Sequence, residues 1–219
     1  MTTTLKAHKG MGMEGSVARW YDRTTRKDMP EIKALAARIA AFVPASAQVL
    51  EVAPGPGFLS IELAKRGLQV QAIDISKTFV EIARRNAAAE DVHARFGLGN
   101  AAALPLDDAS VDFLVCRAAF KNFSEPVKAL AEMRRVLRAG GTALLIDMRR
   151  DASVAELKRY VSALGVSRLN RWFMMLTFRL MLIKRAYPID QIRSMATEAG
   201  WIEPRIDISP VGFEAWMRK

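Results

Sequence analysis

Between residues 48 and 148, five short apolar runs alternate with stretches that carry apolar residues at helical spacing. The runs are QVLEV, VQAIDI, the weaker VHARFGLGN, VDFLVCRAAF and TALLIDM. Strands that are separated by helices form crossover units, in which neighbouring strands run parallel. This alternation therefore predicts a doubly wound α/β domain, with a parallel sheet and helices on both of its faces.

The rest of the chain adds elements around this core. Residues 188–201 read as an amphipathic helix, and the tail WIEPRIDISPVGFEAWMRK reads as two strands around Ser209–Pro210. We therefore expect a Rossmann-like, seven-stranded, mostly parallel sheet with an antiparallel last strand. We expect residues 1–47 to form an N-terminal helical cap, 48–219 to form the domain, and 151–186 to form a helical lid inserted in it.

The loop after the first strand, in VLEVAPGPG at 49–57, is richer in proline and glycine than a simple strand-to-helix connection requires. Glu51 falls near the strand's carboxyl end, where open parallel sheets bind ligands. Gly55 and Gly57 permit close backbone approach and unusual dihedral angles, while Pro54 and Pro56 stiffen the loop. The loop then enters a helix N-terminus, so the sequence predicts a ligand site here.

A dinucleotide site is the first alternative, because residues 55–60 differ by one residue from the GxGxxG/A fingerprint. Asp74, after the second strand, could bind ribose hydroxyls in either case. Ser60, however, replaces the third small apolar residue of the fingerprint, and Glu51 would face an incoming pyrophosphate. These two features favour a ligand with a cationic end and no phosphates.

Four segments together carry a resemblance to a known family. VLEVAPGPG resembles motif I of the class I S-adenosylmethionine-dependent methyltransferases, and QAIDIS resembles their second motif. FGLGNAAALPLDDASVDFLVCRAAFKNF and ALAEMRRVLRAGGTALLID resemble the segments that follow in that family. The resemblance covers about 48–148 well and 188–217 at the level of the fold. It points to the small-molecule group, which includes the ubiquinone and menaquinone biosynthesis methyltransferases.

The resemblance implies S-adenosylmethionine as cofactor and a set of residues around it. Its methionine end would meet Glu51 and the loop backbone, its ribose would meet the second acid, and its adenine would meet residues after the second and third strands. Ala53 stands where the family commonly has glycine, and Asn100 where it commonly has aspartate. The implied cofactor-binding residues are Tyr21, Glu51, Ala53, Gly55, Gly57, Asp74, Ile75, Asn100 and Ala101.

A sulfonium carries its own leaving group, so a strong side-chain base is optional for methyl transfer. Tyr21 could place its aromatic face near the sulfonium, or it could simply fill the core. Lys121 could bind an anionic acceptor or act as a base, or it could be a solvated loop lysine. Tyr21 and Lys121 are therefore the candidate catalytic residues. The candidate substrate residues are Asn122, Trp172 and Met175.

Charge and cysteine usage complete the expectations. The formal net charge is +10, and residues 152–188 carry seven basic groups against one acid. We expect methyl transfer to a small, largely apolar acceptor that could be anionic, with no metal. The alternatives are a methyltransferase acting on RNA, protein or membrane lipid, and a non-catalytic cofactor-binding subunit. We expect a cytoplasmic monomer or homodimer with one buried thiol, Cys116, without a nucleic-acid partner, and with peripheral membrane contact through 151–186.

Overall fold

The computed structural model describes residues 13–163, 175 and 183–219, and its centre is one seven-stranded sheet. The strand order is β3-β2-β1-β4-β5-β7-β6, and only β7 runs antiparallel to its neighbours. This confirms the predicted Rossmann-like fold. The strands are β1 (Gln48–Val52), β2 (Gln69–Asp74), β3 (Arg95–Leu98), β4 (Val111–Arg117), β5 (Leu137–Met148), β6 (Arg205–Ile208) and β7 (Gly212–Arg218).

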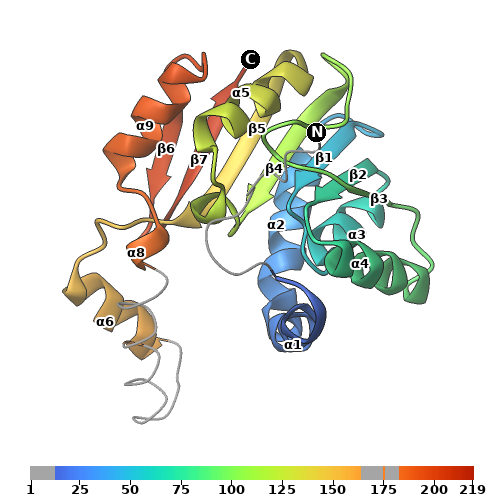
Figure 1. Cartoon of the computed structure of the whole chain (residues 1–219), viewed down its shortest axis with the longest axis horizontal. Coiled ribbons are helices and arrows are strands. Elements are labelled where there is room, and N and C mark those ends of the chain that lie inside the picture. Colours follow the sequence, from blue (N-terminus) through green and yellow to red (C-terminus); the bar gives the residue numbers. More distant parts are fainter. Residues whose placement is uncertain (1–12, 164–174, 176–182) are drawn as a thin grey trace, which may run out of the picture.

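Helices cover both faces of the sheet (Figure 1). Successive strand residues point to opposite sides, so each strand contributes apolar side chains to both layers of helices. Val49 of β1 belongs to the apolar cluster under α2 (Met29–Phe42) and α3 (Phe58–Ala64). Leu50, the next residue, belongs to the cluster under α5 (Pro126–Val136) and α9 (Ile189–Glu198). α4 (Lys77–Ala89) packs beside α3. The near-continuous apolar runs of the sequence are thus buried on both sides, as parallel strands require.

One boundary differs from the sequence prediction. The pattern predicts a helix that ends on Gly140 and Gly141, but α5 ends at Val136 and β5 begins directly at Leu137. Leu137 pairs with Val111, and the register then shifts before the ladder resumes. A Cβ on Gly141 would lie 2.9 Å from the Arg138 carbonyl oxygen. The two glycines therefore bend a strand, and they do not terminate a helix.

The helix α1 (Gly15–Thr25) lies with α6 (Val154–Ala163) at the end of the molecule toward which the β4 and β6 arrowheads point (Figure 1). The start of α1 is fastened to the start of α4. The Glu14 carboxylate accepts hydrogen bonds from the backbone N–H groups of Lys77 and Thr78, both at 3.1 Å. The Ser76 hydroxyl donates to the carbonyl oxygen of Met13 at 2.7 Å. These bonds hold α1 beside the carboxyl end of β2.

The base of α6 is also anchored to the domain. The buried Arg149 guanidinium donates to Glu156 of α6 at 2.6 Å and to the Ser209 carbonyl oxygen at 3.0 Å. Half of the predicted lid 151–186, namely residues 164–174 and 176–182, lies outside the described residues, so the lid and the division at residue 47 stay predictions. Within the described ranges, no helix is both long enough and apolar enough to cross a membrane.

Candidate functional site

Glu51 lies at the carboxyl end of β1, between Ala72 of β2 and Val115 of β4. Its side chain is buried, and the Ser60 hydroxyl donates to its Oε2 at 2.5 Å. Burial raises the pKa of Glu51 to about 7, although the Ser60 hydrogen bond and the Arg117 charge oppose the shift. The carboxyl is therefore poised to change charge near neutral pH. The Ser60 backbone N–H is a second donor to this carboxyl.

The loop that follows holds three residues in left-handed conformations, with φ of 58° at Ala53, 55° at Gly55 and 82° at Gly57. The Ala53 N–H donates to the Ile73 carbonyl oxygen at 2.8 Å, which ties the loop to β2. A Cβ built on Gly55 would lie 3.9 Å from the Tyr21 ring, so α1 covers the loop at this point. At Ala53, the left-handed backbone costs roughly 1 kcal/mol, which the surrounding contacts must offset.

Asp74 ends β2 with both carboxylate oxygens oriented by backbone donors. Oδ2 accepts from the Gly55 N–H at 3.0 Å, and Oδ1 accepts from the Ser76 N–H at 2.8 Å. Burial raises the pKa of Asp74, while backbone hydrogen bonds from Ser76, Gly55 and Ile75 oppose the rise. The two carboxylate oxygens can accept about four hydrogen bonds in total, so acceptor capacity remains beyond these three backbone donors. Asp74 can therefore accept a further hydrogen bond, as a ribose hydroxyl would supply it.

Ile75 and the loop after β3 lie next to this carboxylate. Ile75 is 43% exposed, which is unusual for a large apolar residue beside a strand end. The Gly99 N–H donates to the Asp74 carbonyl oxygen at 2.9 Å, so the loop begins against β2. The Asn100 Oδ1 accepts from the Ala102 N–H at 2.9 Å, which leaves the amide NH₂ as its donor for a ligand. Ala101 is half-buried against the main core.

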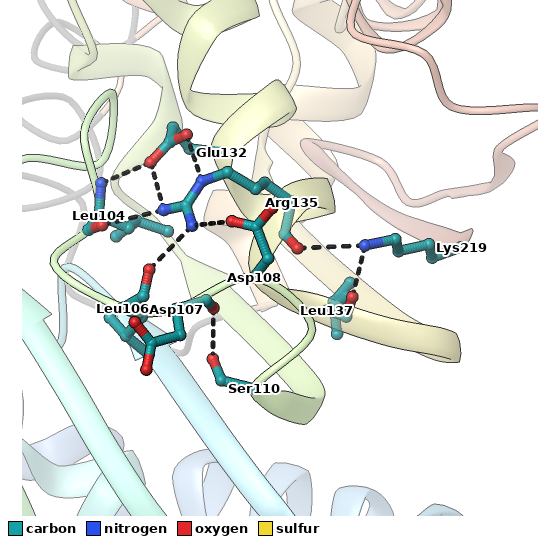
Figure 2. Close-up of polar contacts among 9 residues, drawn as sticks. All are labelled: Leu104, Leu106, Asp107, Asp108, Ser110, Glu132, Arg135, Leu137 and Lys219. Atoms are coloured by element: carbon teal, nitrogen blue, oxygen red, sulfur yellow. Dashed lines mark hydrogen bonds and ion pairs between the residues drawn. The ribbon is translucent and has the colours of Figure 1, made fainter.

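Arg135 of α5 holds the rest of that loop in place (Figure 2). Its guanidinium donates to both oxygens of Glu132, to Asp108 at 2.6 Å and to two loop carbonyl oxygens, those of Leu104 and Leu106. Glu132 in turn accepts from the Leu104 N–H at 2.8 Å. The loop that carries Asn100 therefore has a fixed conformation before any ligand arrives.

Tyr21, predicted beside the sulfonium, projects from α1 toward the loop of β1 and contacts Phe79 edge-on at 5.8 Å. Burial raises the pKa of Tyr21, with the Arg117 charge opposing, so the phenol is neutral at physiological pH. A neutral, half-buried ring suits a packing or aromatic-face role better than that of a base. Its predicted contact with the cofactor stays a prediction.

Lys121 has a different environment from the one that the sequence suggests. Its ammonium donates to Asp147 Oδ1 at 2.8 Å and to the Ala118 carbonyl oxygen at 2.6 Å, and its side chain is only 9% exposed. The ammonium is therefore committed to an internal ion pair, and the catalytic role stays a prediction. Asn122 and Met175 are half-buried, and Trp172 lies outside the described residues.

We expect Lys121→Met to destabilise the fold by about 3–5 kcal/mol, because it leaves the buried Asp147 carboxylate without its cation. Denaturant unfolding measures this effect. The double variant Lys121→Met with Asp147→Asn removes both charges and should recover part of the loss. A single variant with wild-type stability would contradict the structural role and return Lys121 to the list of free bases.

Sequence reasoning missed two residues beside Lys121. Asp147 and Arg117 lie inside the apolar runs TALLIDM and VDFLVCRAAF, and a charged residue inside such a run does not show which charge lies opposite it. Cys116, in contrast, is fully buried as expected, and burial raises the pKa of its thiol well above the usual range. An inert thiol follows.

The comparisons with known proteins agree with this geometry. Residues 50–145 match the family model described as "Methyltransferase domain". The chain is 36% identical over 158 residues to a demethylmenaquinone methyltransferase of Deinococcus radiodurans. The chain contains a class I S-adenosylmethionine-dependent methyltransferase domain. The matched region covers 68% of this chain and 65% of that relative, so the chain spans less than two thirds of the relative's length.

Two further comparisons show how far the similarity of the methyltransferase domain extends. A demethylmenaquinone methyltransferase of Thermus thermophilus is 35% identical over 102 residues, which cover 46% of each protein. The crystal structure of a protein from Methanococcus maripaludis, titled as a methyltransferase dependent on S-adenosyl-L-methionine, superposes with a TM-score of 0.77. It covers 96% of this chain and 95% of its own at 22% identity, which shows a common fold.

The family resemblance, the fold and the cofactor predicted from the sequence are therefore confirmed. The residues of the methyltransferase domain fit that cofactor, since Asp74 keeps acceptor capacity beyond its backbone donors and the buried carboxyl of Glu51 lies at the adjacent strand end. The assignment of individual residues to parts of the cofactor stays a prediction.

Proposed function

We propose that this protein transfers the methyl group of S-adenosylmethionine to a small, largely apolar acceptor by in-line displacement. The observation that carries the proposal is the pair of buried carboxylates, Glu51 and Asp74, at adjacent strand ends. The glycine loop joins them through the hydrogen bond from Gly55 to Asp74. This arrangement suits a ligand with a diol at one end and a cation at the other.

The chain's own residues would bind, orient and exclude water. When bound, S-adenosylmethionine supplies a methyl group on a sulfonium that needs no further activation. Asp74 would hold the ribose diol, Glu51 in its ionised form would face the cationic methionine end, and Asn100 with Ala101 would meet the adenine. Tyr21, on α1, would close the site from above the Gly55 loop. Displacement then depends on holding an acceptor in line and away from water.

The acceptor follows from the relatives and from composition. Two relatives are named for demethylmenaquinone, which supports an acceptor that is small beside a protein or RNA and largely apolar. Met175 and Trp172 would contribute to its pocket, since methionine and aromatic side chains form adaptable apolar walls. We place the reaction in the cytoplasm, because the single buried Cys116 suits a reducing compartment.

The test combines cofactor binding with turnover. Calorimetry should show that the protein binds S-adenosylhomocysteine, and labelled S-adenosylmethionine should pass its methyl group to reduced short-chain demethylmenaquinone or to related phenolic acceptors. Methyl transfer to RNA with a steep salt dependence would favour the nucleic-acid alternative. Cofactor binding without turnover on the whole acceptor panel would favour a non-catalytic subunit. Failure to bind the cofactor would overturn the proposal.

The Glu51 carboxyl makes cofactor affinity depend on pH. Its pKa is about 7 in the free protein, above the ordinary 4.5, so the Glu51 carboxyl is mostly protonated at low pH. It must then lose this proton before a cation can bind beside it. Affinity for S-adenosylmethionine should therefore fall as pH falls below 7, by about 30-fold near pH 5.5 relative to pH 8. Calorimetry over this range measures it. Glu51→Gln should bind weakly and without this slope, and a flat wild-type profile would contradict the assignment.

A further inference from the structure

Arg117 is the last residue of β4, the strand that pairs with β1 on the side away from β2. The sheet order therefore reverses between β1 and β4, and ligands of open parallel sheets bind at such a reversal. The next residue, Ala118, has φ of 58°, so the chain turns sharply after Arg117. The Lys121 ammonium holds that turn through the Ala118 carbonyl oxygen. The backbone that carries the Arg117 side chain is therefore held in place at the carboxyl end of the sheet, where the cofactor would bind.

The guanidinium of Arg117 is poorly satisfied for its position. Its side chain is 30% exposed, and its one ion pair with a described residue is to Glu31 of α2 at 3.8 Å. Glu31 is 78% exposed, and this distance is beyond a hydrogen bond. Exposed pairs of this kind contribute little to stability. A guanidinium has five N–H donors, so most of its capacity is left for a ligand.

Other partly or fully buried cations of the domain are bonded much more completely. Lys121 has a carboxylate and a carbonyl oxygen, and Arg149 has the Glu156 carboxylate and two carbonyl oxygens. Arg135 has two carboxylates and two carbonyl oxygens. Arg117 is the exception among these four. A structural role therefore accounts for the other three and does not account for Arg117.

The charge of Arg117 lowers the pKa values of three groups, those of Glu51, Tyr21 and Tyr160. Burial raises the pKa values of Glu51 and Tyr21, and in both cases the Arg117 charge works against the rise. Burial and the charges of Glu31 and Asp28 raise the pKa of Tyr160 on α6, and Arg117 again opposes them. The Arg117 charge therefore acts on the carboxyl end of β1, on α1 and on α6, the first helix of the predicted lid.

We propose that Arg117 is an anion subsite that binds a carboxylate or an ionised phenolic oxygen of the methyl acceptor. The proposal rests on the proposed function and names the charge of its substrate. A cation so close to a site for a sulfonium raises the electrostatic cost of that site, and an anionic acceptor would offset it. Guanidinium forks pair with carboxylates in two parallel hydrogen bonds, which also fixes the orientation of the acceptor. The sequence prediction gave this task to Lys121, whose ammonium is already paired.

A carboxylate at Arg117 could come from the acceptor or from the methionine portion of the cofactor. Arg117 ends β4 and its charge also acts on Tyr160 of α6, the first helix of the predicted lid, which favours the acceptor. The variant Arg117→Met removes the guanidinium and keeps a similar apolar stem. Arg85→Met is the matched control, because Arg85 lies exposed on α4 and loses the same charge elsewhere.

The experiment is calorimetry on protein loaded with S-adenosylhomocysteine, using 1-hydroxy-2-naphthoate and its uncharged methyl ester as probes. Wild type and Arg85→Met should prefer the carboxylate by about tenfold or more, and Arg117→Met should lose that preference while it binds the ester unchanged. Affinity for S-adenosylhomocysteine should be the same in all three proteins. Thermal melting checks that Arg117→Met is folded, and Arg117→Lys should restore part of the preference.

Three outcomes overturn the proposal. No preference for the carboxylate in wild type, including no binding of either probe, excludes an anion subsite for the acceptor. An unchanged preference in Arg117→Met excludes this residue. If Arg117→Met weakens S-adenosylhomocysteine but not methylthioadenosine, which lacks the carboxylate, the anion belongs to the cofactor. Failure of the wild type to bind S-adenosylhomocysteine at all would instead count against the proposed function.

Discussion

Replacing Gly57 with alanine should destabilise the protein by about 3 kcal/mol, which corresponds to roughly 6–12 °C in Tm for a domain of this size. Two costs add. A Cβ at this position would lie 2.8 Å from the Ala83 Cβ and 2.9 Å from the Phe96 ring, so α3, α4 and β3 would have to move apart. The backbone φ of 82° also disfavours any residue with a side chain.

Gly67→Ala separates these two costs. Gly67 has nearly the same φ, 84°, but nothing lies within 4 Å of the Cβ that alanine would add. It should therefore carry only the backbone cost of about 1–2 kcal/mol. Thermal and denaturant unfolding of both variants measure the difference. Equal losses would show that close packing at Gly57 is unimportant, and the tight contact would then have no energetic consequence.

Asp74→Asn should weaken binding of S-adenosylhomocysteine by about 10- to 100-fold, since hydrogen bonds to a charged group contribute roughly 1.5–3 kcal/mol each. An amide has only one oxygen, so one backbone donor, that of Gly55 or of Ser76, would face an NH₂ group. The variant would lose both the hydrogen bond that holds the loop after β1 and an oxygen that accepts from the ribose diol. Titration calorimetry measures the affinity directly.

Asp91→Asn is the control for this change. Asp91 is exposed after α4 and has φ of 51°, which asparagine tolerates. It alters net charge by the same amount and should leave cofactor affinity unchanged. If Asp74→Asn bound the cofactor like wild type, the carboxylate would not be the ribose ligand, and the family resemblance would not transfer to this position.

The sequence predicted the fold because its strongest patterns are long-range and redundant. The β1 boundaries, Gln48–Val52, agree with the apolar run QVLEV, and α4 starts at Lys77, where the Ser76 hydroxyl accepts from the Phe79 N–H as a helix cap. The glycine pair at 140–141 misled the prediction, because glycine is common both after helices and at strand bends. Only the partner strand, β4, decides between the two.

The candidate site was predictable where ligand chemistry requires particular backbone shapes. Asp74 and the Gly55 loop are adjacent in the structure, as their positions after neighbouring parallel strands imply. Gly57 was expected to admit a ligand, and the structure adds a packing reason that no local pattern carries. The roles of Lys121 and Arg117 depend on which charge lies opposite, and Asp147 is 26 residues from Lys121 in sequence. Such pairings cannot be read from one strand alone.

The clasp between Glu14 and the first turn of α4 has a consequence for biogenesis. Its partners are separated by 63 and 64 positions, so the ribosome finishes α1 long before the amides that receive Glu14 exist. The nascent segment must wait undocked until β1, α3 and β2 have assembled and α4 has begun. The cofactor site is therefore completed late, when α1, although it was translated first, docks on the first turn of α4.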